Sequence, residues 1–503
     1  MTKSAALALV FVCLVFPFTC AAEESPMEPV ETVQSQPDSQ AGTKAGPSEG
    51  AGSIPRKDTA IPGWPVAAHT DTDTAPPSAG CAWLESAAPQ LLGLQFNGVY
   101  QYMPPFHSPY QGPHSLSFHN NEEQDTTHTY GVYLGMQLAR NLQLYVDTEL
   151  FQGFGVSDGL GLAGYVNGDV VRAGSSNLPK IPYLARYYFR YFIPLSSESE
   201  KVERCMDQLP GEQPVSRVEI KFGRLALTDD FDQNRYANNN RSQFMNYDLL
   251  FNTAWDYAAD TRGYSVGTVV SLFEPRWKLA LGVFMLPNTQ NGAQFDYWDT
   301  QEFGYNLELT VKPNNAGTVI RVLTYFNEGR MGDYDQALAL GQATHTVPNI
   351  LAVEETGGRK YGFGLNFEQP LADDGETGIF GRLGWNDGNH ESWEYVECDR
   401  DVSLGAQVSG IHWNRPDDRV GVAYGVNGLS EPHREYLEAG GIGMLLGDGK
   451  LNYGLEQAFE IYYRIPVGRY VQISPDFQFI QNPGYNKDRG PVEVYGVRLH
   501  LVY

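Results

Sequence analysis

Apolar and polar side chains alternate with a period of two over many short segments of the chain from Leu94 onward. In the segment 302–312 the apolar set is Phe303, Tyr305, Leu307, Leu309 and Val311. Because successive side chains of a strand point to opposite faces, each segment predicts a strand with one apolar and one polar face. Sixteen segments show this pattern: 94–102, 128–138, 141–150, 181–193, 216–226, 263–273, 277–286, 302–312, 318–326, 361–369, 377–385, 402–412, 419–426, 452–465, 469–479 and 492–503.

The lengths of these segments and of the gaps between them predict how the strands are arranged. Most segments are near the roughly 9–11 residues with which a tilted strand crosses a bilayer, and an even number closes a barrel with both ends on one side. Long gaps such as 103–127 and 151–180 alternate with short ones such as 139–140 and 467–468. A soluble β-sandwich or propeller also has alternating strands, but it has no reason to alternate its loop lengths.

The fold class that follows is all-β: a closed antiparallel transmembrane β-barrel of 16 strands, with long external loops and short periplasmic turns. The segment 94–503 forms this outer-membrane barrel. One connection departs from the rule, because 194–215 is too long for a tight turn.

The residues before the barrel predict export. Lys3 precedes an apolar run that ends in Cys20-Ala21-Ala22, which indicates a signal peptide over 1–22. Residues 23–78 are rich in Pro, Ser, Thr, Glu, Gly and Ala, and such a composition predicts a disordered periplasmic tail or spacer. The residues 79–93 are predicted to form a short periplasmic helix or plug segment.

Composition narrows the function classes. The formal net charge of −25 argues against nucleic-acid binding, which calls for basic patches. Three cysteines remain after the signal, Cys81, Cys205 and Cys398, and they make no disulfide framework. A Cys81–Cys205 pair stays open, whereas Cys398 falls in an outer loop and is expected to remain apart from both.

Two enzyme-like motifs and one acidic cluster do not have the context that their chemistry needs. Gly159-x-Gly161-x-x-Gly164 matches a dinucleotide fingerprint without a βαβ unit, and Gly263-x-Ser265-x-Gly267 lies in an alternating strand. Asp229, Asp230 and Asp232 lack the rest of a calcium loop. We therefore expect no catalytic residue, no metal and no cofactor.

The candidate site is the polar face of the strands, which would line a water-filled lumen. For any one side chain the simpler interpretation is a solvated or ion-paired wall; the functional one is a constriction where Arg donors and carboxylate acceptors bind sugar hydroxyls and aromatic rings stack on sugars. The candidates are Arg186, Arg190, Arg321, Arg382, Arg464, Arg498, Asp147, Glu149, Glu308, Glu368, Glu456, Glu460, Tyr188 and Tyr462.

Three blocks carry a family resemblance. The residues 477–484 followed by 494–499, the block 223–246 and the block 149–164 are similar to motifs of the carbohydrate-selective porins of the OprB type. The resemblance spans about 94–503 and implies a 16-stranded barrel, an inward-folding third loop at 227–262, passive diffusion of mono- or oligosaccharides, and no cofactor. The long 194–215 connection departs from the family pattern.

The leading hypothesis is thus a bacterial outer-membrane porin through which sugars diffuse across a constricted, mixed-charge lumen. The alternatives are a porin for other solutes and, less favoured, a barrel enzyme or an adhesin. The expected partners are sugars, outer-membrane lipid and lipopolysaccharide, the barrel assembly machinery through the terminal Tyr503, and two further copies in a homotrimer, with no nucleic acid.

Overall fold

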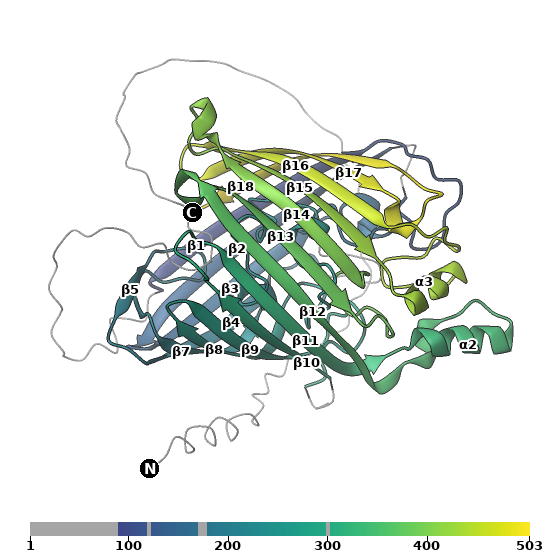
Figure 1. Ribbon diagram of the computed structural model, residues 1–503, viewed down its shortest axis with the longest axis horizontal. Helices are drawn as coiled ribbons and strands as arrows, with labels where there is room; N and C mark the ends of the chain where they lie inside the picture. Colours follow the sequence, from purple (N-terminus) through teal and green to yellow (C-terminus); the bar gives the residue numbers. More distant parts are fainter. Residues whose placement is uncertain (1–88, 118–121, 170–178, 298–301) are drawn as a thin grey trace, which may run out of the picture. The chain divides into compact units, whose positions relative to one another are not determined.

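The computed structural model describes residues 89–503 except 118–121, 170–178 and 298–301, and it contains a closed antiparallel barrel (Figure 1). Sixteen strands form it in the order of the chain. They are β1 (Leu91–Met103), β2 (Glu123–Ala139), β3 (Leu142–Gln152), β4 (Tyr183–Pro194), β7 (Arg217–Leu225), β8 (Ser265–Glu274), β9 (Trp277–Met285), β10 (Phe303–Val311), β11 (Val319–Met331), β12 (Glu355–Ala372), β13 (Thr377–Asn386), β14 (Arg400–Ser409), β15 (Arg419–Gly428), β16 (Glu456–Val467), β17 (Val471–Gln481) and β18 (Val492–Val502).

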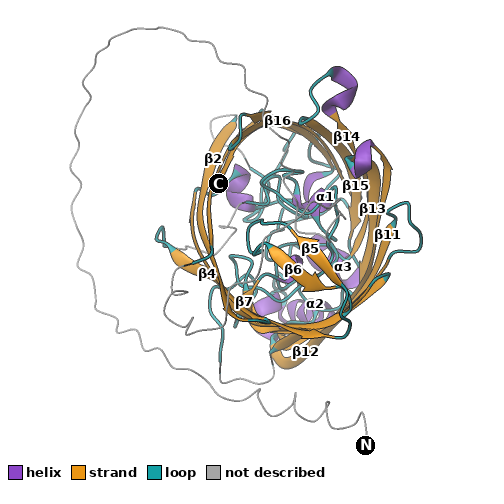
Figure 2. Ribbon diagram, turned by 90° about the vertical axis from the view of Figure 1, so that its left-hand side faces the viewer, coloured by secondary structure: helices purple, strands orange, loops and turns teal. Residues whose placement is uncertain are grey.

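The first and last strands close the ring. β1 pairs antiparallel with β18, with Gln95 opposite Val502 and Tyr102 opposite Tyr495, and the resulting ring is seen end-on in Figure 2. Each of the sixteen segments expected from alternation corresponds to one barrel strand, so the predicted fold class is confirmed.

The start of the barrel needs a correction. β1 begins at Leu91, three residues before the expected start, so the predicted helix or plug segment 79–93 is wrong at 91–93. The reason is that Leu91 and Gly93 already face inward while Leu92 is exposed, which continues the alternation of the strand. The predicted signal peptide, the tail and residues 79–88 of that segment lie outside the described residues.

The alternation of the sequence becomes an inside and an outside. On β10, Asn306, Glu308 and Thr310 are buried on the lumenal face, whereas Leu307 and Leu309 are exposed on the outer one. A hydrocarbon surrounding requires every backbone donor and acceptor to be paired, and a closed ring of strands achieves this without a free edge.

Short helices occur in the connections. They are α1 (Tyr247–Leu250), α2 (Tyr334–Thr344) and α3 (Glu431–Glu438). The side chain of Asp333 accepts a hydrogen bond from the backbone N–H of Gln336 at the start of α2, and Ser430 accepts one from His433 at the start of α3, which are the usual N-cap contacts. None of the helices within the described ranges has the length and apolar character needed to cross a membrane.

The long connection between β4 and β7 forms a small hairpin of its own. Its strands, β5 (Ser199–Val202) and β6 (Gly211–Pro214), pair with each other and with no barrel strand. Cys205 lies near its tip with a free thiol; the open question of a bond to Cys81 concerns a residue outside the described ones.

Candidate functional site

The third loop, 227–262, lies inside the barrel. Nearly all of its side chains are buried or half-buried, and Figure 2 shows loop segments and α1 within the ring of strands. Its backbone amides and side chains bond to residues on the lumenal faces of strands more than a hundred positions along the chain. The lumen is therefore occupied by loop, and the question is which of the candidate side chains hold the loop and which face the remaining space.

Four of the candidate carboxylates hold loops. Glu460 accepts the backbone N–H groups of Met245 and Asn246, at 2.6 and 2.8 Å. Glu308 accepts the N–H of Asp232 and Glu368 that of Arg235, both at 2.7 Å, and Glu456 accepts N–H groups at Ala163 and Gly484. All four are buried, so these carboxyl groups hold the backbone of the loops through buried hydrogen bonds.

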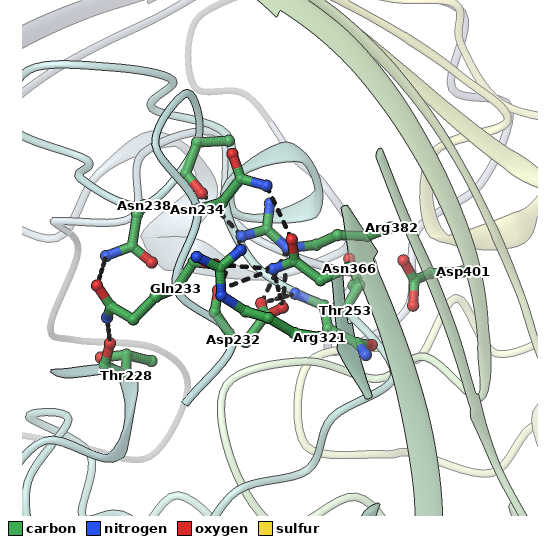
Figure 3. A network of polar contacts seen from close by, with 12 residues as sticks. Thr228, Asp232, Gln233, Asn234, Asn238, Thr253, Arg321, Asn366, Arg382 and Asp401 are labelled. Atoms are coloured by element: carbon green, nitrogen blue, oxygen red, sulfur yellow. Dashed lines mark hydrogen bonds and ion pairs between the residues drawn. The ribbon is translucent and has the colours of Figure 1, made fainter. Parts of the chain in front are cut away.

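A buried arginine completes the anchor of the third loop. Nε of Arg382 donates to the carboxylate of Asp232 at 2.9 Å, and its Nη2 donates to the backbone carbonyls of Asp232 and Ala237 (Figure 3). Asn366 donates to the same carboxylate at 2.6 Å. Arg321, drawn beside them, is paired with Glu368 at 3.3 Å.

The remaining wall arginines differ in what they contact. Arg498 donates to the carbonyls of Asn240 and Gln243 of the third loop, both at 2.7 Å. Arg190 forms a two-pronged pair with Glu219 on the neighbouring strand. Nε of Arg464 is buried without a hydrogen-bond partner among the described residues.

The candidate aromatic rings do not face open space. Tyr188 is 4% exposed and stacks on Tyr145, with ring centroids 5.2 Å apart. Tyr462 is 1% exposed and packs edge-on against Phe244 of the third loop. Tyr188 therefore packs between two strands of the wall, and Tyr462 packs between the wall and the third loop.

Arg186 is the candidate that joins several charged groups and still reaches solvent. Its guanidinium contacts Asp229 of the third loop at 2.7 Å, Asp147 of β3 at 3.5 Å and Asp207 of the hairpin at 3.7 Å. The side chain of Arg186 is 14% exposed and that of Asp229 is 34% exposed. This is the mixed-charge, partly open part of the lumen.

A second cation–carboxylate pair lies near this group. Lys221 binds both carboxylate oxygens of Asp230, at 2.8 and 3.0 Å. Asp229, Asp230 and Asp232 thus pair with three different cations, Arg186, Lys221 and Arg382, and their carboxylates do not converge as a calcium loop would.

A further arginine, from the third loop, reaches β3 two residues along the strand from Asp147. Arg241 pairs with Glu149 at 3.0 Å and with Asp169 at 3.2 Å. Burial lowers the pKa of Arg241, but Asp169 and Glu149 raise it by more, so the group stays charged. Glu149 also accepts from the hydroxyls of Tyr133 and Tyr264.

The candidate set from the sequence is thus divided. The structure brings Arg186 and Asp147 together at the open part of the lumen and uses most of the others as loop anchors. Sequence reasoning missed Lys221, Asp207, Asp229 and Arg241 as lumenal groups. Lys221 follows Arg217 and Glu219 on the lumenal face of β7, so the alternation could have found it. The other three lie in connections, where a period-two pattern gives no information.

The nucleophile-like motif has no catalytic surroundings. Ser265 is the first residue of β8, is fully buried, and its hydroxyl donates to the carbonyl of Met285 at 2.6 Å. A nucleophile elbow needs a strand, a sharp turn and a helix, whereas here the strand simply continues.

A 16-stranded barrel with an inward-folded loop and a charged, narrowed lumen defines a porin-type channel. The family model of the carbohydrate-selective porins, the OprB family, matches residues 133–503, and the chain belongs to that family. It is an outer-membrane sugar porin of bacteria, as the sequence predicted.

The comparison with the solved structure of a porin from Pseudomonas putida supports the fold. OprB of Pseudomonas putida shares 14% identity over 82% of this chain and 94% of its own, with a TM-score of 0.60. The outer-membrane channel DcaP of Acinetobacter baumannii shares 9% identity over 82% of this chain and 96% of its own, with a TM-score of 0.44. No curated protein sequence matches the chain significantly.

Proposed function

We propose that sugars cross this porin past a mixed-charge group formed by Arg186, Asp229, Lys221 and Asp207. The observation that carries the proposal is the position of Arg186, which contacts wall, third loop and hairpin and remains partly exposed. Most of the other candidates already form hydrogen bonds that hold loops, so this group offers the donors and acceptors that a solute can reach.

The chemistry suits polyhydroxylated solutes. A sugar hydroxyl is both donor and acceptor, so it can take a hydrogen bond from a guanidinium while it gives one to a carboxylate. The planar guanidinium of Arg186 has five directed donors, and Asp229 supplies acceptors beside it. Since the acids and bases are already paired, each sugar contact replaces an existing one, which keeps binding weak enough for release.

The experiment is liposome swelling with purified porin. We expect a monosaccharide to enter faster than a dipeptide of similar size, because the dipeptide cannot satisfy the same set of donors and acceptors. Asp229→Asn keeps the shape and removes the charge, and we expect it to lower this preference. Rates that depend on solute size alone, in wild type and variant alike, would favour the alternative of a porin without preference for sugars.

A conservative control separates specific recognition from general charge. Arg186→Lys keeps the positive charge but loses the planar fork, and we expect it to lose sugar preference nearly as far as Arg186→Gln does. Arg359→Gln removes a surface arginine that is 63% exposed, and we expect it to leave both rates unchanged.

Further partners belong to the same proposal. The exposed apolar side chains of the outer face, such as Leu307 and Val497, are suited to lipid and the acyl chains of lipopolysaccharide, and a homotrimer would use part of this face. Tyr503 is 56% exposed at the end of the closing strand and is available to the barrel assembly machinery. Sedimentation of the detergent-solubilised protein distinguishes a trimer from a monomer, and deletion of Tyr503 is expected to reduce the yield of folded barrel.

A further inference from the structure

The connection between β4 and β7 is a hairpin whose tip packs inside the barrel. A turn on the periplasmic side does not need this length to join the two strands. The hairpin's residues 195–216 leave β4 at the rim where the chain's short turns lie, and in the end-on view of Figure 2 its strands β5 and β6 are seen across the opening of the ring. A two-residue turn would suffice to connect antiparallel neighbours such as these. The additional residues thus require an explanation.

Polar contacts, here called the seat of the hairpin, hold it against the lumenal wall. Nη1 of Arg190 donates to the side-chain carbonyl of Gln208 at 2.8 Å, and Nη2 points toward that of Gln213 at 3.4 Å. The backbone N–H of Leu209 donates to the hydroxyl of Tyr145 at 3.1 Å. At its base, Arg217 of β7 pairs with Glu200 at 3.3 Å. The hairpin is held by β3, β4 and β7.

An apolar contact adds to this seat. Leu209 is 4% exposed and belongs to the same packed cluster as Leu91 and Tyr145. Met206 fills the space left by Gly93 of β1, where a β-carbon would lie 2.6 Å from its sulfur. A side chain at position 93 would therefore displace the side chain of Met206.

The tip reaches the middle of the barrel. Asp207 lies 3.7 Å from Arg186, which also contacts Asp147, the middle residue of the 11-residue strand β3. The same guanidinium binds Asp229 of the third loop. The hairpin and the third loop enter from opposite ends of the lumen and share one arginine.

We propose that the hairpin 195–216 is a second selectivity element, which limits solute size on the periplasmic side in series with the third loop. It rests on the proposed function only in taking sugars as the permeating solutes. Asp207, 19% exposed, gives this element a polar edge that hydroxylated solutes can contact. The hairpin also braces the constriction, because Asp207 and Asp229 hold Arg186 from two sides.

The test replaces residues 196–215 by Asn-Gly, which joins the existing Leu195–Ser216 hydrogen-bonded pair by a two-residue turn. Folding is checked by the difference in gel mobility before and after boiling. Liposome swelling with a monosaccharide, a disaccharide and a trisaccharide then measures size dependence. We expect the disaccharide rate relative to the monosaccharide rate to rise several-fold, together with the single-channel conductance.

A second variant keeps the length of the chain and removes the seat. Gln208→Ala, Leu209→Ser and Gln213→Ala together should undock the hairpin and change the rate ratio in the same direction by less. As a matched control, residues 411–417 are replaced by Asn-Gly between Gly410 and Asp418, a turn on the same side that is mostly exposed. This control should leave the ratio unchanged.

The outcomes separate the inference from the function. If the wild type admits sugars and both hairpin variants are folded but keep the wild-type ratio, the hairpin is no selectivity element and the proposal is overturned. If the wild type admits no sugar at all, the proposed function fails, and a rise in conductance on deletion would still support the hairpin as a constriction.

Discussion

At the scale of single residues, the lumenal charges of this porin are mostly structural. A charged side chain in a barrel wall needs compensation, and the third loop supplies it: its N–H groups bind carboxylates, while its carbonyls and Asp232 bind arginines. The same carboxylates and arginines that alternation places on the lumenal face therefore determine how the loop is held, and only a few of them remain for solutes.

This arrangement predicts a large effect of one substitution. Arg382→Gln leaves the carboxylate of Asp232 buried without its cation, and removing one partner of a buried pair costs about 3–5 kcal/mol. We expect the barrel to lose its folded gel mobility at a clearly lower temperature than the wild type. We also expect its single-channel current to fluctuate more, because the third loop is held less firmly.

The control for this prediction is a pair of the same chemistry at the surface. Arg359 pairs with Glu328 at 3.2 Å with 63% of its side chain exposed, and such pairs contribute about 0–1 kcal/mol. Arg359→Gln should therefore behave as the wild type does. Equal shifts for both variants would contradict the anchoring role of Arg382.

At the scale of elements, α2 and α3 form a pair of helices above the external end of the lumen. Tyr334 of α2 stacks on His433 of α3, with ring centroids 4.4 Å apart, and Ile350 donates its N–H to the hydroxyl of Tyr436. His433 is fully buried and contacts Asp399 at 2.9 Å and Glu397 at 3.5 Å. The contact between the two helices thus centres on a buried charge.

The charge makes the docking of this helix pair depend on pH. Burial lowers the pKa of His433, but Asp399 and Glu397 raise it to about 9, from an ordinary value of 6.5. A raised pKa means that the stabilisation is complete below pH 6.5 and is lost as the pH rises through about 9. The pKa of Asp399 is depressed by His433, so its contribution is present above its ordinary value of 3.8 and is lost only in stronger acid.

A neighbouring carboxyl acts in the same direction at high pH. Burial raises the pKa of Glu391 to about 8, so alkali places a charge in a site that disfavours it. We expect amide hydrogen exchange in 334–344 and 431–438, corrected for intrinsic rates, to be faster at about pH 9.5 than at about pH 6. His433→Gln should flatten this dependence. Equal protection at both values in the wild type would rule out the charge as the source of docking.

At the scale of the whole molecule, the barrel is predictable from sequence because its determinant is local. A period of two specifies which face of a strand is apolar, and a shift by one residue would expose the polar face to lipid. All sixteen strands follow from this pattern. The alternation also predicts which side chains face the lumen, as the buried positions 306, 308 and 310 of β10 show.

The way in which the loops fill the barrel depends on contacts between residues far apart in the sequence. The alternation of apolar and polar residues carries no information about such contacts. Arg241 meets Glu149 across 92 positions and Asp232 meets Arg382 across 150. The hairpin 195–216 was visible in the sequence only as a connection too long for a turn. For this reason the candidate residues were placed correctly on the wall, whereas their roles as loop anchors were not foreseen.

The orientation of the barrel gives a last prediction, which tests the two ends of the molecule together. Val347, beside α2, is 60% exposed, and Lys201 in the hairpin has a side chain that is 73% exposed. If the helix pair is external and the hairpin periplasmic, a large membrane-impermeant maleimide should label Val347→Cys in intact cells. It should label Lys201→Cys only after the outer membrane is permeabilised. The unmodified protein is the control, since Cys398 is buried and Cys205 is half-buried. Labelling of Lys201→Cys in intact cells would show that the barrel has the opposite orientation in the membrane. The hairpin would then restrict the entrance of the channel rather than its exit.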